Sequence, residues 1–123
     1  MTTLQSAVAR HMSEAELMAN VIARASHAGW HVMHINDRLY RLAAKEGRGD
    51  AMIGGRGFPD LVLARAGLVI FAELKATIGR LAPEQSEWLA ALDPGICSSR
   101  HRVVVWRPVH LFDGTIDDAL AGP

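Results

Sequence analysis

The chain of 123 residues lacks the usual features of secreted, disulfide-stabilised and membrane proteins. Its single cysteine, Cys97, excludes an internal disulfide and a cysteine-rich zinc site. The longest apolar run, at 66–72, has seven residues and is far too short to span a bilayer. The first residues lack a basic segment followed by an apolar one, so we expect no signal peptide. These absences favour a reducing, cytoplasmic setting without a membrane partner.

An excess of one charge is also lacking, because 13 basic residues balance 13 acidic ones. This balance excludes a non-specific polycation but not a nucleic-acid-binding protein, since the distribution of charge matters more than its sum. Residues 37–80 carry eight basic and five acidic side chains, whereas residues 81–123 carry three arginines and six acids. The middle is locally basic, which fits either phosphate contacts or an ordinary solvated surface.

Periodicity and turn residues predict one α/β domain over residues 1–123, with a mixed central sheet flanked by helices. The strand at 68–75 is apolar on both faces as far as Glu73, which is typical of a central strand covered on both sides. Residues 36–58 are expected to form a long polar loop, with one helical turn at 38–44. The predicted elements are a helix at 13–27, strands at 30–35, 60–64 and 68–75, a helix at 83–92, a strand at 102–106 and a helix at 116–120.

Polar residues stand where the helix and strand patterns require apolar ones. At about 100° per residue, Glu14 falls on the same helix face as Val21 and Ala25. Glu73 and Lys75 are two apart in a strand, so both side chains project from one face. Each placement also has an ordinary explanation. Glu14 can stabilise a helix dipole, and Glu73 and Lys75 can form an ion pair at a strand end.

Two further polar residues point to the same predicted core. Asp60 follows Pro59 at the start of a strand, and Gln85 shares a helix face with Trp88 and Leu92. Turn chemistry and a satisfied core amide are the ordinary explanations. Burying several ionised groups is costly unless they are paired or bind a metal. A shared site for Mg²⁺ or Mn²⁺ explains all of them, and an adjacent lysine suits metal-assisted phosphodiester hydrolysis.

The segments that hold these residues resemble the VRR-NUC domain of the PD-(D/E)xK nuclease superfamily. The resemblance covers about residues 13–108 and leaves no break in the catalytic pattern. It implies a restriction-endonuclease-like fold with a mixed central sheet flanked by helices. The matching segments are SEAEL at 13–17, Gly29-Trp30, GFPDL at 57–61, ELK at 73–75, GRLAPEQ at 79–85 and VVVWRP at 103–108.

The resemblance also implies a role for each residue near the predicted metal. Asp60, Glu73 and the backbone carbonyl of Leu74 would bind Mg²⁺ or Mn²⁺. Lys75 would position the attacking water. Glu14 would hold a second metal or an ordered water bound to the first.

Gln85 would brace this site, and Arg48, Arg56 and Arg80 would contact DNA phosphates. Stand-alone members of the family, mostly bacteriophage or bacterial, resemble Holliday junction resolvases, which work as homodimers. We therefore expect a metal-dependent endonuclease for branched DNA, acting in recombination or repair in a bacterial or phage-infected cell. Recognition would depend on DNA shape, because phosphate contacts carry no sequence information.

Three alternatives stay open from the sequence. The same site would serve a flap, general or restriction-type nuclease. A catalytically silent module would bind junction DNA without cutting it. A zinc site is a further possibility, because His27, His31 and His34 are close in sequence, although they lie on different predicted elements.

Overall fold

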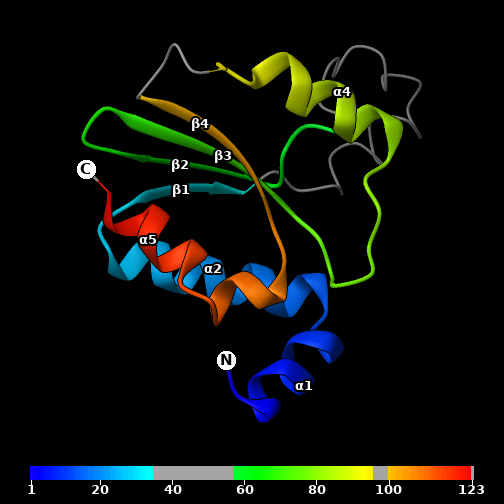
Figure 1. The fold of residues 1–123 in the computed structure, drawn as a ribbon. Helices are drawn as coiled ribbons and strands as arrows, with labels where there is room; N and C mark the ends of the chain where they lie inside the picture. The colour runs from blue at the N-terminus through cyan, green and yellow to red at the C-terminus, as the bar shows by residue number, and fades with distance from the viewer. Residues whose placement is uncertain (35–56, 96–99, 123) are drawn as a thin grey trace, which may run out of the picture.

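A mixed four-stranded sheet forms the centre of the computed structural model, which describes residues 1–34, 57–95 and 100–122 (Figure 1). The strands lie in the order β1-β2-β3-β4. The pairs β1–β2 and β2–β3 are antiparallel, and the pair β3–β4 is parallel. The expected mixed α/β class is confirmed, and β3 is an interior strand as predicted. The strand bounds are β1 His31–His34, β2 Leu61–Arg65, β3 Leu68–Leu74 and β4 His101–Trp106.

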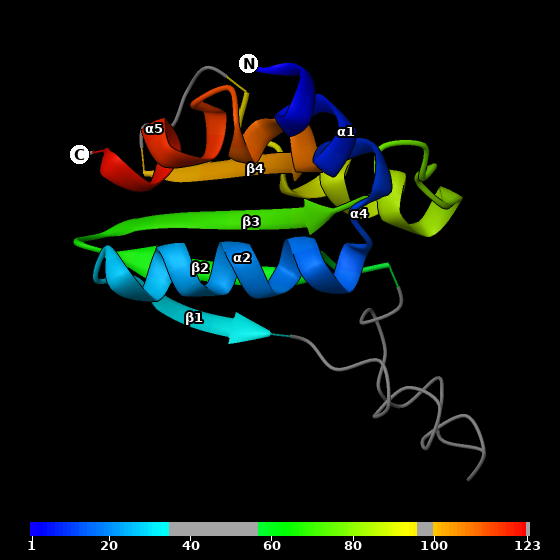
Figure 2. The same cartoon turned by 90° about the horizontal axis from the view of Figure 1, so that it is seen from below.

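Helices cover both faces of the sheet. Helices α2 and α5 lie on one face and α4 lies on the other (Figures 1 and 2). Helix α1 packs against the 3₁₀ helix η1, which also contacts α5. The helix bounds are α1 Thr3–His11, α2 Glu14–His27, α4 Pro83–Leu92, η1 Pro108–Leu111 and α5 Thr115–Ala121.

Helix α2 forms as the sequence predicts. Ser13 caps it by accepting the Glu16 N–H through Oγ at 3.1 Å, while Glu16 accepts the Ser13 N–H at 3.2 Å. This reciprocal pair satisfies two backbone donors that the helix leaves free. Leu17, Val21 and Ala25 are fully buried against the sheet. Burial of this apolar stripe fixes α2 against the sheet, where it contacts β1 and β3.

Strand β3 separates two environments. Its even-numbered side chains, from Leu68 to Leu74, are buried in the core that includes the apolar face of α2. Alternate side chains point to the opposite face of a strand, so Phe71 and Glu73 face α4. Phe71 meets Phe58 edge to face, and Phe58 meets Trp88 of α4 in the same way. These aromatic contacts dock α4 beside the end of β3.

Two elements were not predicted from the sequence, α1 and η1. Helix α1 has a weak apolar pattern, since Leu4 and Val8 are exposed and Ala9 is its one buried residue. Local capping by Thr2 and Gln5 and packing on η1 define it instead. The core also extends past residue 108 through Leu111, Ile116 and Leu120.

Some predictions fall on residues that the structure does not describe. These are the loop over 36–56 with its turn at 38–44, together with Arg48, Arg56 and Cys97. In the described ranges, no helix combines the length and apolar character needed to cross a bilayer.

Candidate active site

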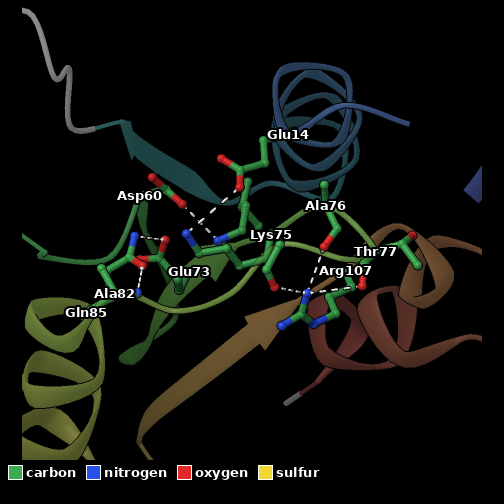
Figure 3. A network of polar contacts seen from close by, with 11 residues as sticks. Glu14, Asp60, Glu73, Lys75, Ala76, Thr77, Ala82, Gln85 and Arg107 are labelled. Carbon is green, nitrogen blue, oxygen red and sulfur yellow. Dashed lines mark hydrogen bonds and ion pairs between the residues drawn. The ribbon is translucent and has the colours of Figure 1, made fainter. Parts of the chain in front are cut away.

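Five residues singled out by the sequence converge at the carboxyl end of β3 (Figure 3). Asp60 directly precedes β2, Glu73 is the penultimate residue of β3 and Lys75 follows that strand. Glu14 is the first residue of α2, and Gln85 lies in the first turn of α4. The site is thus built where two helices begin and one strand ends.

Asp60 is held by the main chain of β3. Its Oδ2 accepts the Leu74 N–H at 2.8 Å. Extending the register of the β2–β3 pair places Leu74 opposite Pro59, which has no backbone N–H of its own to pair. The next N–H along β3, that of Lys75, donates to the Trp106 carbonyl at 3.0 Å. The Asp60 carboxylate therefore ends the β2–β3 ladder and is fixed beside Glu73.

Glu73 is a buried carboxyl, with only 1% of its surface exposed. Its Oε1 accepts a hydrogen bond from Gln85 Nε2 at 3.0 Å, whereas its Oε2 is buried and has no partner among the described residues. Burial, followed by the negative charge of Asp60, raises the pKa of Glu73 from 4.5 to about 9. The positive charge of Lys75 opposes this rise. At neutral pH, Glu73 thus carries a proton unless a cation compensates its charge.

Gln85 connects α4 to this carboxyl. Its Oε1 accepts the Ala82 N–H at 2.7 Å, so the side chain helps to cap α4 while its Nε2 reaches Glu73. Both polar ends of the amide are engaged, which fixes its orientation. The inward direction expected from the helical spacing is therefore observed.

Lys75 pairs with Glu14 across the end of the sheet. Its Nζ lies 3.9 Å from Glu14 Oε1, and the lysine side chain is only 11% exposed. Glu14 is 52% exposed, which corrects the expectation that it sits within the buried stripe of α2. The reason is that α2 begins at the sheet edge, so burial starts one turn later at Leu17. Within the described residues, Lys75 forms no ion pair with Glu73.

Arg107 is a contributor that the sequence analysis missed. Its Nη1 donates to the carbonyls of Ala76, Thr77 and Gly79 at 2.7, 3.4 and 2.7 Å (Figure 3). A Cβ added to Gly79 would lie 3.5 Å from Glu14 Oε1, so this turn rests against the carboxylate that pairs with Lys75. Sequence spacing gave no signal for these contacts.

The remaining predicted residues are less informative. Arg80 is exposed just after the turn, while Arg48 and Arg56 lie outside the described residues. No three His, Cys, Asp or Glu side chains of the described chain form a group that could hold a metal ion. His27, His31 and His34 therefore build no zinc site. Asp60 and Glu73 remain as a pair of neighbouring carboxyls.

Comparisons of the chain with protein-family models, with curated proteins and with solved structures returned no significant match. The fold and site define a mixed α/β protein that carries two neighbouring carboxyls, a largely buried lysine and a glutamine hydrogen-bonded to one of the carboxyls.

Proposed function

We propose that this protein is a metal-dependent endonuclease of the VRR-NUC type, with a restriction-endonuclease-like fold, that cuts branched DNA. The observation that carries the proposal is Glu73, which is buried beside Asp60 with one oxygen left without a partner among the described residues. A structural role alone does not explain this arrangement, because an apolar pair would be less costly at that position. A cation would compensate both carboxyls.

The donor set suits Mg²⁺ or Mn²⁺. Asp60 and Glu73 supply carboxylate oxygens, which hard cations prefer. Leu74 is a third candidate, since the N–H and C=O of a strand residue project from the same edge and its N–H already meets Asp60. Mg²⁺ commonly uses one or two carboxylates and completes its shell with water and substrate phosphate. A pair of carboxyls is therefore sufficient for this class of site.

Each side chain would contribute a distinct task. A bound cation would supply Lewis acidity and would neutralise charge on the scissile phosphate. Lys75, sheltered and paired with Glu14, would donate a hydrogen bond that orients the attacking water. The Leu74 N–H keeps Asp60 in place, and Gln85 keeps Glu73 in place. As the water forms the new P–O bond it releases a proton to solvent, the bond to the leaving oxygen breaks, and that oxygen takes up a proton from solvent.

Branched DNA is the substrate class that we favour, with a homodimer placing two sites on two strands. The exposed Arg80 beside the site would contact phosphate, and Arg48 and Arg56 would extend that contact. A flap, general or restriction-type nuclease is the nearest alternative, because it would use the same residues. A junction-binding module without cleavage is the other.

A cleavage panel tests this proposal. Purified protein would be incubated with a four-way junction, a 5′ flap, a replication fork and linear duplex, each with Mg²⁺, Mn²⁺ or EDTA. Lys75→Met would be compared with Arg24→Met, which removes one positive charge near the far end of α2. Metal-dependent cutting of branched DNA that is lost only in Lys75→Met would support the proposal. Preferential duplex cutting would overturn the branched substrate, and binding without cleavage under any metal would overturn the nuclease. Sedimentation velocity would test the dimer.

A further inference from the structure

The turn at 76–79 presents an apolar side chain to solvent beside the candidate active site. Ile78 is 91% exposed, the highest exposure among the large hydrophobic residues of the described chain. Single exposed apolar residues are common on protein surfaces and carry little information alone. Ile78, however, directly precedes Gly79, at which a Cβ would lie 3.5 Å from Glu14 Oε1, and in sequence it stands between Lys75 and the exposed Arg80.

The turn is fixed from several directions. Arg107 donates to three of its carbonyls, including that of Gly79 at 2.7 Å. The Gly79 N–H closes the turn on Ala76 O at 3.0 Å. The Thr77 hydroxyl donates to the Ala9 carbonyl of α1 at 2.9 Å, which ties the turn to a second element.

The hydrogen bonds that fix the turn also determine the direction of the Ile78 side chain. A free loop would fold an isoleucine back onto neighbouring apolar surface, because burial of such a side chain is favourable. The hydrogen bonds from Arg107 and Thr77 hold the backbone and keep Ile78 pointing outward. The surface therefore keeps an apolar side chain in a position where only an external partner can bury it.

We propose that Ile78 is a wedge that packs against the open face of a base pair at a DNA branch point and thereby selects branched DNA over continuous duplex. The inference rests on the proposed nuclease function and specifies how its substrate is recognised. Aliphatic side chains are used as wedges between base steps, at the cost of unstacking them. At a branch point the stack is already interrupted, so that cost is smaller and burial of Ile78 favours the branched form.

The test compares Ile78→Ala with Leu4→Ala, which truncates a side chain that is 74% exposed on α1. The readout is the ratio of kcat/KM for a four-way junction to that for linear duplex, at fixed salt and Mg²⁺. Ile78→Ala should lower this ratio about tenfold, the scale of losing most of one buried aliphatic side chain. Leu4→Ala should leave the ratio at the wild-type value. The fluorescence of a 2-aminopurine base at the branch should change on binding of wild type and Leu4→Ala but not of Ile78→Ala.

A second variant tests the bracing without altering Ile78. Arg107→Met removes the three carbonyl contacts and should lower the same ratio. Its control is Arg65→Met, because Arg65 donates to the carbonyls of Ala28 and Gly122, each at 2.8 Å, and lies on the hairpin at the opposite end of β3. The Arg65 change should reduce thermal stability without changing the ratio.

The outcomes separate this inference from the function on which it rests. If wild type cuts branched DNA and Ile78→Ala keeps the wild-type ratio and the 2-aminopurine signal, the wedge is wrong and the nuclease stands. If wild type cuts no DNA with either metal, the proposed nuclease is wrong, and the wedge is rejected with it. An equal loss on duplex and branched DNA would also reject the wedge.

Discussion

Gln85 joins the first turn of α4 to the buried carboxyl of Glu73 by a hydrogen bond of 3.0 Å from its Nε2. The same side chain accepts the Ala82 N–H, so helix capping and site bracing share one residue. A second glutamine of the chain caps a helix without bracing a carboxyl, so it can serve as a control for this double role. Gln5 accepts the Thr2 N–H at 2.9 Å in the capping box of α1 and contacts no carboxyl within the described part of the structure.

The two roles of Gln85 should separate in a paired substitution. Gln85→Leu and Gln5→Leu each remove a capping hydrogen bond and should each lower the free energy of unfolding by about 1 kcal/mol. Only Gln85→Leu should also lower kcat, because it alone frees Glu73. Urea unfolding and steady-state cleavage would measure both effects. Equal kcat values for the two variants would contradict a bracing role.

Glu73 should make the metal-free protein less stable as pH rises. The folded protein keeps the proton of Glu73 up to a pKa of about 9, whereas the unfolded chain releases it around 4.5. Its contribution is therefore fully present below about 4.5 and is lost as pH rises through about 9. Glu73→Gln cannot ionise, so in EDTA it should exceed the wild type in melting temperature at pH 8.5 and approach it at pH 4.5.

Glu87→Gln, on the exposed face of α4, is the matched control and should follow the wild type. Mn²⁺ should raise the wild-type melting temperature more at pH 8.5 than at pH 6, because the cation competes with the Glu73 proton. That gain should be absent in Glu73→Gln. If the melting temperatures of the wild type and Glu73→Gln in EDTA changed in parallel with pH, the raised pKa of Glu73 would be refuted.

Glu14 and Glu16 lie two residues apart at the start of α2. Their substitution should have opposite effects on stability and on cleavage activity. Glu16 completes the capping box with Ser13, so Glu16→Gln should weaken folding and leave kcat intact. Glu14 is half exposed and pairs with Lys75, so Glu14→Gln should change the free energy of unfolding by less than about 0.5 kcal/mol. Its kcat should nevertheless fall about tenfold or more, because Lys75 would lose the carboxylate that orients it and misplacing a catalytic group can cost about 100-fold. Thermal melts and cleavage rates would reveal the contrast, and a wild-type rate for Glu14→Gln would remove Glu14 from the site.

Gly57 should be far less tolerant of a side chain than Gly29. Both have positive φ, at 84° and 87°, and an alanine there is strained by about 1–2 kcal/mol. At Gly29 a Cβ meets nothing within 4 Å, whereas at Gly57 it would lie 2.6 Å from the Glu84 backbone. Gly57→Ala should therefore cost an additional 1–3 kcal/mol, roughly, and push the start of α4 and Gln85 away from Glu73. Denaturant unfolding of both variants, followed by cleavage assays, would show whether activity is lost only at Gly57.

Local rules accounted for most of the fold. The capping pair of Ser13 and Glu16 and the spacing of the buried Leu17 predict α2 without reference to any other element. The unbroken apolar run at 68–72 predicts an interior strand covered on both faces in the same way. Helix α1 was missed because its exposed Leu4 and Val8 break the amphipathic pattern, and its place depends on packing against η1.

The candidate site was predictable in membership but not in its contacts. Glu14, Glu73 and Gln85 stood out because each broke an apolar pattern. The partner of Lys75 depends on where α2 begins relative to the sheet edge, which is a tertiary property. Arg107 acts on carbonyls about thirty residues earlier in the chain, and no periodicity encodes such a contact.

The parallel pairing of β4 with β3 has a consequence for synthesis of the protein. Strands β1, β2 and β3 pair antiparallel, and the short hairpin between β2 and β3 is a local contact that needs no later part of the chain. The Lys75 N–H, in contrast, donates to the Trp106 carbonyl, and Arg107 holds the turn that follows Lys75. Neither contact can form before those later residues are synthesised. A nascent or prematurely terminated chain would carry both carboxyls yet lack an ordered lysine. If the chain is the proposed nuclease, cleavage of DNA should therefore begin only after β4 has been synthesised.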